Sequence, residues 1–119
     1  MRHQKKNLKL NNRDCSHRKL LVRNLVTSLI LFEKIKTTPA KARLAKSELE
    51  RLIATVKRKD KINAIRLLNS FLLHKNACLK TMDILIKRYE NRTSGFVRVV
   101  KLGMRVGDAA PIVQMELVK

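Results

Sequence analysis

The sequence predicts an α+β fold in which about four helices pack on a small sheet and follow an extended basic N-terminal tail. Apolar residues recur at helical spacing from residue 16 to about residue 90, and two β-rich runs, 96–102 and 112–118, come after them. Residues 1–15 are rich in Lys, Arg, Asn and Gln and have no apolar period. In a chain of 119 residues we expect a tail over 1–15 and a single α+β domain over 16–119.

The net charge narrows the class of partner. The chain carries 28 Lys and Arg against nine Asp and Glu, which gives a formal net charge of +19. Such a chain repels itself and favours a polyanionic partner. The alternative is a solvated, lysine-rich surface, but a surface of that kind usually carries a comparable number of acids. Because only 3% of the residues are aromatic, we expect an aliphatic core.

The first helix is expected over residues 16–33. Leu21, Leu25, Leu29 and Phe32 recur at three- and four-residue spacing, which is typical of one helix face. Ser16 is the expected N-cap, because its hydroxyl can accept hydrogen bonds from the free amides of the first turn.

A short strand and a second helix are expected next. Residues 34–38 (KIKTT) are short and β-branched, as in a strand or an extended connector. Thr38 and Pro39 favour a helix start, because a proline at the first helical position loses no needed hydrogen bond. The expected apolar face of this helix consists of Ala42, Ala45, Leu49, Leu52 and Val56.

Residues 61–90 are compatible with one kinked helix or with two. Two are favoured, because the apolar faces do not stay in phase across His74. Asp60 and Asn76 are the expected N-caps. The expected inward residues are Ile65, Leu68 and Leu72 in the third helix, and Leu79, Met82, Ile86 and Tyr89 in the fourth.

The two C-terminal runs, 96–102 and 112–118, predict an antiparallel hairpin with a wide loop. Gly103, Gly107 and Pro111 interrupt the sequence between them. In the second run, every other residue from 113 to 117 is expected to be buried, because Val113, Met115 and Leu117 alternate with their neighbours.

The sequence predicts no catalytic site, metal or cofactor. Cys15, Ser16 and His17 are adjacent, but the members of a catalytic triad converge from distant positions and need an orienting group. Cys15 and His17, even with His3, do not fill a tetrahedral metal site. The carboxylates are scattered and no phosphate-binding glycine motif is present, so no small-molecule substrate is expected.

Glu33 is an isolated acid in a basic stretch, and two interpretations stay open. It could pair with Arg or Lys across the fold and hold the base of the tail. It could also form a simple surface pair, worth under about 1 kcal/mol.

No membrane partner is expected. No apolar run approaches the ~18 residues that are needed to cross a bilayer. A helix that lies on a membrane surface carries its cations along one face, whereas the cations of this chain come before the periodic segment. The two cysteines make a poor disulfide framework and no secretory signal is visible, which favours a reducing cytosol.

Nucleic acid is the remaining class of partner, and RNA is favoured over DNA. An extended tail suits the crevices of folded RNA, and the sequence shows no helix-turn-helix, zinc finger or aromatic single-strand platform. Lys and Arg neutralise phosphates, while Asn, Gln and His supply further hydrogen-bonding groups. The predicted RNA-binding residues are Arg2, His3, Lys5, Lys6, Lys9, Arg13, His17, Arg18, Arg23, Arg92, Arg98 and Arg105.

Motifs near both ends of the chain carry a resemblance to one family. The first group is MRHxK at 1–5, Ser16-His17-Arg18, Arg23-Asn24-Leu25, Ser28-Leu29, Glu33-Lys34-Ile35-Lys36-Thr37-Thr38 and Lys41-Ala42. The second group is Gly95-Phe96-x-Arg98, Lys101-x-Gly103, Arg105-x-Gly107-Asp108-x-Ala110-Pro111 and Glu116-Leu117-Val118. Over essentially its full length, the chain resembles the seventeenth large-subunit ribosomal protein of bacteria.

The resemblance implies a non-enzymatic structural constituent of the large ribosomal subunit in the bacterial cytoplasm. Such a protein binds large-subunit rRNA at the subunit surface, near the nascent-chain exit and beside neighbouring large-subunit proteins. The resemblance also implies a three-stranded mixed sheet with KIKTT as one strand. The sequence departs from the family at Asp14-Cys15, which puts an acid inside the expected RNA-facing segment, and it diverges freely over residues 57–90.

Two other classes of protein are kept as alternatives. A free-standing RNA- or DNA-binding regulator would bind its target without co-purifying with large subunits. An enzyme would need a pocket of convergent polar groups, which the sequence does not indicate.

Overall fold

The computed structural model describes residues 14–119, and the predicted tail lies outside these residues except for Asp14 and Cys15. The elements in chain order are α1 (Cys15–Phe32), β1 (Lys34–Thr37), α2 (Pro39–Arg58), α3 (Lys61–Phe71), α4 (Lys75–Lys80), a π-helical turn η1 (Thr81–Leu85), α5 (Ile86–Arg88), β2 (Val97–Met104) and β3 (Pro111–Leu117). Because α4, η1 and α5 follow one another without a break, they form one helical segment. The predicted α+β class, with four helical segments and three strands, is confirmed.

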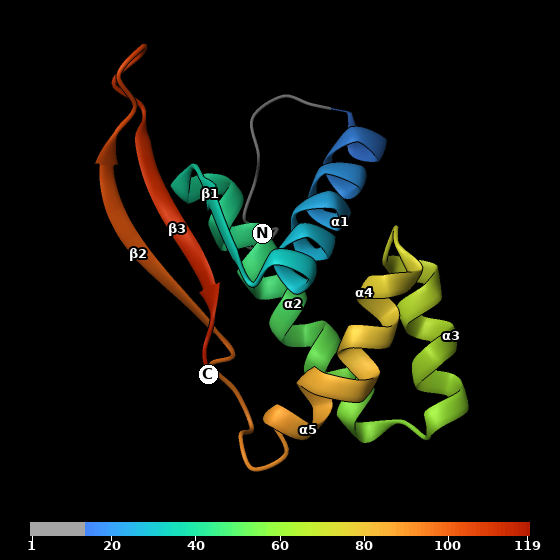
Figure 1. Ribbon diagram of the computed structural model, residues 1–119. Coiled ribbons are helices and arrows are strands. Elements are labelled where there is room, and N and C mark those ends of the chain that lie inside the picture. Colours follow the sequence, from blue (N-terminus) through green and yellow to red (C-terminus); the bar gives the residue numbers. More distant parts are fainter. Residues whose placement is uncertain (1–13) are drawn as a thin grey trace, which may run out of the picture.

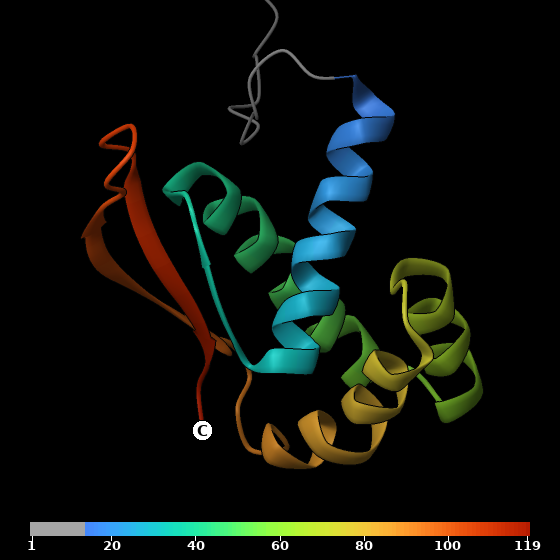
Figure 2. The same cartoon turned by 45° about the horizontal axis from the view of Figure 1, so that its top comes forward.

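The helices and the sheet lie side by side. The sheet is on one side of α1 and α2, and the helical segments of residues 61–88 are on the other (Figures 1 and 2). α2 contacts α1, α3, β2 and β3, so its apolar face is at the centre of the core. The predicted apolar face of α2 is confirmed, since Ala42, Ala45, Leu49, Leu52 and Val56 are all buried.

Helix α1 begins one residue earlier than predicted, and its N-cap is Asp14, so the prediction of Ser16 is wrong. The Asp14 carboxylate accepts hydrogen bonds from the Cys15 backbone N–H at 2.7 Å and from the Ser16 hydroxyl at 2.8 Å. An aspartate is as good an N-cap as a serine. Its negative charge also suits the positive end of the helix dipole.

The buried face of α1 differs from the predicted one near its C-terminal end. Val26, Leu29 and Ile30 are fully buried, whereas Phe32 is 72% exposed. The reason is that the buried face of α1 centres on Val26, Leu29 and Ile30, and Phe32, two residues after Ile30, lies about 200° further around the helix. After Phe32 the helix ends, and Glu33 adopts a left-handed conformation, with φ of 61°, that turns the chain into β1.

Glu33 connects four elements of the fold. Its backbone N–H and C=O bond to Leu29 of α1 and to Leu117 of β3. Its carboxylate is 2.9 Å from Lys80 Nζ in α4, and it accepts two hydrogen bonds, each of 3.2 Å, from the guanidinium of Arg88 in α5. Of the two interpretations left open, pairing across the fold is the one that the structure shows.

The break between the third and fourth helices confirms the prediction of two helices. The N-cap of α4 is His74, so the prediction of Asn76 is wrong, while Asp60 stands at the predicted N-cap position of α3. The Asp60 carboxylate, however, accepts hydrogen bonds from the Asn63 side chain and makes none to the helix backbone. In α3 the buried residues are Ala64 and Leu68, and Ile65 is exposed.

The π-helical turn changes which residues of the fourth helix are buried. Thr81, Leu85 and Tyr89 are buried, whereas Leu79, predicted to face inward, is 51% exposed. A π-turn places one extra residue in a helical turn, so the face of the helix rotates at that point. The spacing rule for a regular α-helix therefore identified Tyr89 correctly and Leu79 incorrectly.

The sheet is wholly antiparallel, so the mixed sheet implied by the resemblance is wrong. The strand order is β1-β3-β2, with Lys34 opposite Glu116 on one side of β3 and Arg98 opposite Glu116 on the other. β1 pairs antiparallel with β3 from Lys34 opposite Glu116 to Thr37 opposite Val113. The predicted burial of Val113, Met115 and Leu117 is confirmed.

The hairpin of β2 and β3 has a bulge at Lys101 to Gly103, where Gly103 has φ of 129°. A positive φ of this size suits glycine and strains other residues. Beyond the bulge the hairpin extends past the helices, and its loop residues are exposed (Figure 1). The loop is fixed by a backbone hydrogen bond of 2.8 Å from Arg105 N–H to the Ala110 carbonyl.

Candidate nucleic-acid interface

The first turns of α1 present two of the predicted RNA-binding residues. His17 is exposed and Arg18 is half-buried, directly after the Asp14 cap. The hydrogen bonds from Ser16 and from the Cys15 backbone lower the pKa of Asp14, with a smaller contribution from the charge of Arg18. Asp14, the acid inside the expected RNA-facing segment, therefore has a structural role as the N-cap of α1.

Arg23 connects α1 to the end of α3. Its Nε donates to the Phe71 carbonyl at 2.6 Å, and its Nη2 donates to the Ser70 carbonyl at 3.1 Å. These carbonyls lie at the C-terminal end of α3, where a cation is favoured by the helix dipole. Arg23 was predicted as an RNA ligand, and the structure gives it this second role.

Arg105 lies in the hairpin loop and forms a bidentate salt bridge with Asp108. Its Nε and Nη2 are 2.9 Å and 2.6 Å from the two carboxylate oxygens. The guanidinium lowers the pKa of Asp108 to about 2, so the acid stays ionised at neutral pH. The pair is charge-neutral, which weakens the case for Arg105 as a phosphate ligand.

The other two predicted cations lie apart from these. Arg98 on β2 is 3.5 Å from Glu116, which is also 3.8 Å from Lys34 of β1. Arg92 donates to the Gly95 carbonyl at 3.0 Å, in the segment that joins α5 to β2. In Figures 1 and 2 the start of α1 and the hairpin loop lie at one end of the molecule, and the segment after α5 lies at the other.

His17 and Arg18, in the first turn of α1, thus lie at the same end of the molecule as the hairpin loop, but the two are well separated there (Figures 1 and 2). The structure does not bring Arg92 to this end. The predicted residues Arg2, His3, Lys5, Lys6, Lys9 and Arg13 lie outside the described residues.

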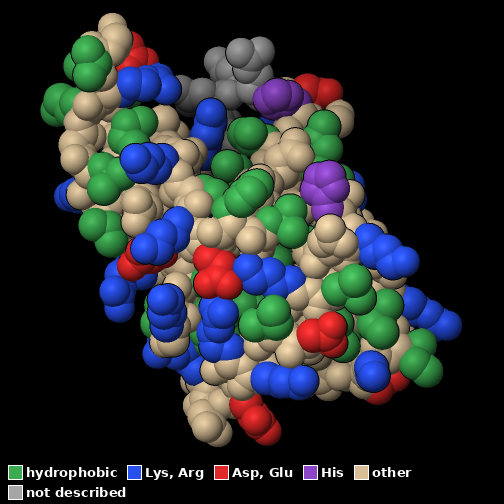
Figure 3. Space-filling model, in the orientation of Figure 1, with side chains coloured by type: hydrophobic (Ala, Val, Ile, Leu, Met, Phe, Trp, Pro, Cys, Tyr) green, Lys and Arg blue, Asp and Glu red, His purple; other side chains and the backbone are tan. Residues whose placement is uncertain are grey.

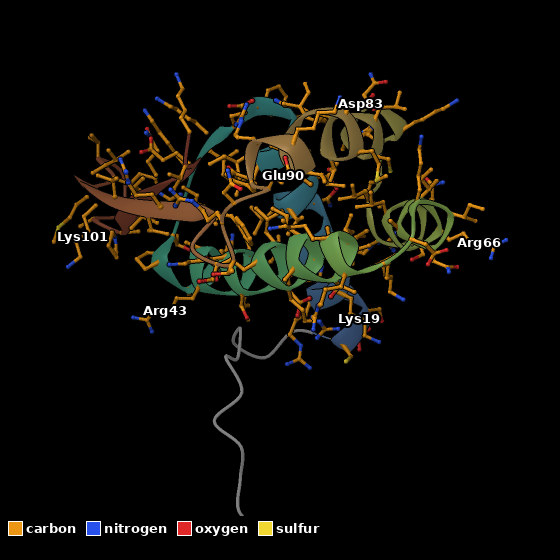
Figure 4. The ribbon with its side chains drawn as sticks, turned by 90° about the horizontal axis from the view of Figure 1, so that it is seen from below. Lys19, Arg43, Arg66, Asp83, Glu90 and Lys101 are labelled. Carbon is orange, nitrogen blue, oxygen red and sulfur yellow. The ribbon has the colours of Figure 1, made fainter. Side chains whose placement is uncertain are left out.

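A basic surface on α1 and α2 was missed by the sequence reasoning. Lys19 of α1 and Arg43 of α2 point outward on the same side of the molecule, whereas Asp83 lies on the opposite side (Figure 4). Arg43 and Arg51 are both exposed. Their spacing of eight residues, which is close to two turns of an α-helix, was a signal that could have identified this outer face.

Few of the positive charges are neutralised within the protein. Across residues 14–119, five Lys or Arg side chains form ion pairs, with the acids Glu33, Asp108 and Glu116. Figure 3 shows Lys and Arg distributed over one face, with a few acidic side chains among them. A surface with this excess of cations can neutralise a row of phosphates.

Other kinds of site find little support in the described part of the chain. No group of three or more His, Cys, Asp or Glu side chains within residues 14–119 is placed to hold a metal ion. Among the helices of the same residues, none has the length and apolarity needed to cross a bilayer.

The fold and the surface charge define a small, strongly basic α+β protein. Residues 21–118 match the family described as ribosomal protein L17. The chain belongs to this family, and the predicted family is confirmed.

Similar proteins cover the chain from end to end. The large ribosomal subunit protein bL17 of Pelobacter propionicus is 41% identical over 119 residues, which is 100% of this chain and 92% of the relative. The protein of the same name from Pelagibacter ubique is 40% identical over 118 residues, or 99% of this chain and 80% of the relative. That of Endomicrobium trichonymphae is 42% identical over 103 residues, or 87% of each chain.

Family membership settles the broad function. The chain is a ribosomal protein with a structural, non-enzymatic role, and as a member of a bacterial ribosomal family it is located in the cytoplasm.

Proposed function

We propose that this protein is a constituent of the large ribosomal subunit that binds and braces large-subunit rRNA. The observation that carries the proposal is the excess of cations, of which only five within residues 14–119 form ion pairs with acids. The relatives named as large ribosomal subunit proteins support the choice of subunit. The resemblance on the quoted motifs supports a place at the subunit surface near the nascent-chain exit, beside neighbouring large-subunit proteins.

The mechanism is charge neutralisation by surfaces of fixed shape. The helices α1 and α2 are held by the core, and the ion pairs of Glu33 fix the end of α1 to Lys80 and Arg88. Cations on such a frame release the counterions of the phosphates that they contact. The basic residues 1–13 extend this surface along the RNA. Because the protein surface is rigid, the RNA segments that bind to it are held in a fixed position relative to one another.

Co-sedimentation of the intact chain with ribosomal particles at moderate salt tests the proposal. We expect the protein to travel with large subunits and to leave them at high salt. A protein that binds free RNA or DNA and stays out of the large-subunit fraction would be a free-standing regulator, and the proposal would be wrong.

A further inference from the structure

A cavity of about 420 Å³ opens between α1, α2 and the end of α3. Its walls include the side chains of Val22, Leu44 and Phe71, all of which are half-buried. A volume of this size lies in the range of small-ligand sites. The apolar walls, which include one aromatic ring, can accept a flat and partly apolar group.

Cations surround this apolar surface. Arg18, Lys19 and Arg23 all line the cavity from α1. The two carbonyl groups at the end of α3 fix the guanidinium of Arg23, and a fixed guanidinium plane can stack on a nucleobase. Neither Arg18 nor Lys19 forms an ion pair among residues 14–119, so their charges can meet a phosphate.

Glu48 is the one acid of the described residues that lines the cavity. Within residues 14–119, no group donates a hydrogen bond to its carboxylate or lies within 4.0 Å of it as an ion-pair partner. A carboxylate repels phosphate and accepts hydrogen bonds only. Glu48 therefore favours a ligand that offers hydrogen-bond donors to its carboxylate and carries a separate negative charge for Arg18 and Lys19.

An unpaired guanine nucleotide has this combination of groups. The Watson–Crick edge of guanine presents two neighbouring N–H donors, which suit the two oxygens of one carboxylate. On the same edge adenine and cytosine each present one donor group beside an acceptor, and uracil presents one donor between two acceptors, so none of them offers two neighbouring donor groups. Unpaired bases of RNA are commonly held by stacking on aromatic or Arg side chains and by hydrogen bonds to this edge.

We propose that the cavity binds one unpaired guanine nucleotide of the RNA, with the base against Phe71 and Arg23, its donors on Glu48 and its phosphate on Arg18 and Lys19. This inference rests on the proposed RNA-binding function and adds base recognition to it. The phosphate contacts position the strand, and Glu48 supplies the specificity.

The test compares two short RNA probes, one with a single guanine among uridines and one with adenine at the same place. Fluorescence anisotropy with the intact protein is expected to show at least about tenfold tighter binding of the guanine probe. In Glu48→Gln the preference is lost, because the amide replaces one acceptor by a donor. Asp83→Asn is the matched control, since it removes the same charge on the opposite side of the molecule (Figure 4) and keeps the preference.

Cys15 provides a second readout without a mutation. Its thiol is exposed at the cavity, whereas Cys78 is buried and burial raises the pKa of the Cys78 thiol. The guanine probe is expected to slow alkylation of Cys15 by N-ethylmaleimide more than the adenine probe does. Alkylated protein is expected to lose the preference for guanine.

Equal affinity for the two probes, or a preference that survives in Glu48→Gln, would overturn the inference. If the protein still co-sediments with large subunits in that case, the proposed function stands and only the base-recognition site is wrong. Failure to associate with large subunits would instead remove the proposed function itself.

Discussion

Glu33 lies where α1, β3 and the helical segment of residues 75–88 meet. Its side chain is 27% exposed, and its carboxylate is held by Lys80 and Arg88 together. Hydrogen bonds from Arg88 and then from Lys80 lower its pKa from 4.5 to about 2. Lys80 also donates to the Leu31 carbonyl at 3.1 Å, so the same ammonium group binds the end of α1 twice.

We expect Glu33→Gln to lower the free energy of unfolding by about 1–2 kcal/mol at pH 7, because the two cations lose their charged acceptor. Urea denaturation measures this change. Asp83→Asn, at an exposed position, is the control and should change stability by less than about 0.5 kcal/mol.

The stability supplied by Glu33 also depends on pH. Because the pKa of Glu33 in the folded protein lies below its ordinary value, the contribution is fully present above about pH 4.5 and is lost as the pH falls toward 2. The difference between wild type and Glu33→Gln should therefore shrink over this interval. A difference that stays constant from pH 7 to pH 2.5 would contradict the assignment.

Asp14 shows how a single residue can be misjudged from sequence alone. Its charge is unfavourable beside RNA, and Ser16, two residues further on, was the more obvious cap. The N-cap is the residue just before the first helical residue. Because α1 starts at Cys15, the cap is Asp14 and not Ser16. Sequence patterns fix helix ends only to within a few residues, because capping energies of neighbouring candidates are similar.

We expect Asp14→Ala to loosen the first turn of α1, since the Cys15 amide and the Ser16 hydroxyl lose their acceptor. Faster amide hydrogen exchange over residues 15–18, with unchanged exchange in α2, is the expected result. Ser16→Ala serves as the control, because Ser16 donates to Asp14 and caps nothing itself.

At the scale of elements, α2 joins the core to the segment that leads into the hairpin. Lys57 Nζ donates to the carbonyls of Tyr89 and Arg92, both at 2.7 Å, and to that of Glu90 at 3.2 Å. The hydroxyl of Tyr89 in turn donates to the Val118 carbonyl at 2.7 Å, beyond the end of β3. The end of α5 is thereby fixed to both α2 and the C-terminal end of the sheet.

We expect Lys57→Met to cost about 1–3 kcal/mol of unfolding free energy, because three carbonyls lose a charged donor while the apolar stem is kept. Thermal unfolding and amide exchange over residues 89–95 measure the effect. Lys59→Met, two residues further on and exposed, should leave both nearly unchanged. Equal losses in the two variants would mean that charge alone, and not the three contacts, matters.

Regular elements could be predicted from the sequence, and irregular ones could not. The face of α2 was correct because Ala42 to Val56 keep one period through an uninterrupted helix. Leu79 was placed wrongly because a π-turn interrupts the period, and this turn has no signal in the residue pattern. Phe32 was placed wrongly because the buried face of α1 is centred on Val26, Leu29 and Ile30. The same limit applies to the candidate interface, where Arg18 and Lys19 line a cavity that forms only when α1, α2 and the end of α3 pack together.

At the scale of the whole molecule, charge and shape act together. The core is a single cluster of aliphatic side chains with Tyr89 and Phe96 as its aromatic members. Apolar residues Leu102, Met104 and Val106 are exposed on the hairpin, where they are available to a neighbouring molecule. The basic surfaces of α1 and α2 lie outside this core, so they can be altered without unfolding the protein.

Deletion of residues 2–13 removes Arg2, Lys5, Lys6, Lys9 and Arg13 and is expected to leave the domain folded. Binding to large-subunit rRNA should weaken sharply, because five phosphate-neutralising charges are lost. Circular dichroism checks the fold, and filter binding measures the affinity. A truncated chain that enters large subunits as well as the intact one would show that the tail hypothesis is wrong.

The dependence of rRNA affinity on salt tests the central claim most directly. If the protein braces large-subunit rRNA through several phosphate contacts, the logarithm of the association constant falls linearly with the logarithm of salt concentration. Each phosphate contact contributes a slope of about −0.7 to −0.9. We expect a steep slope for the intact chain and a shallower one after deletion of residues 2–13. A flat response in the intact chain would contradict electrostatic binding and indicate attachment through apolar contacts or through another protein.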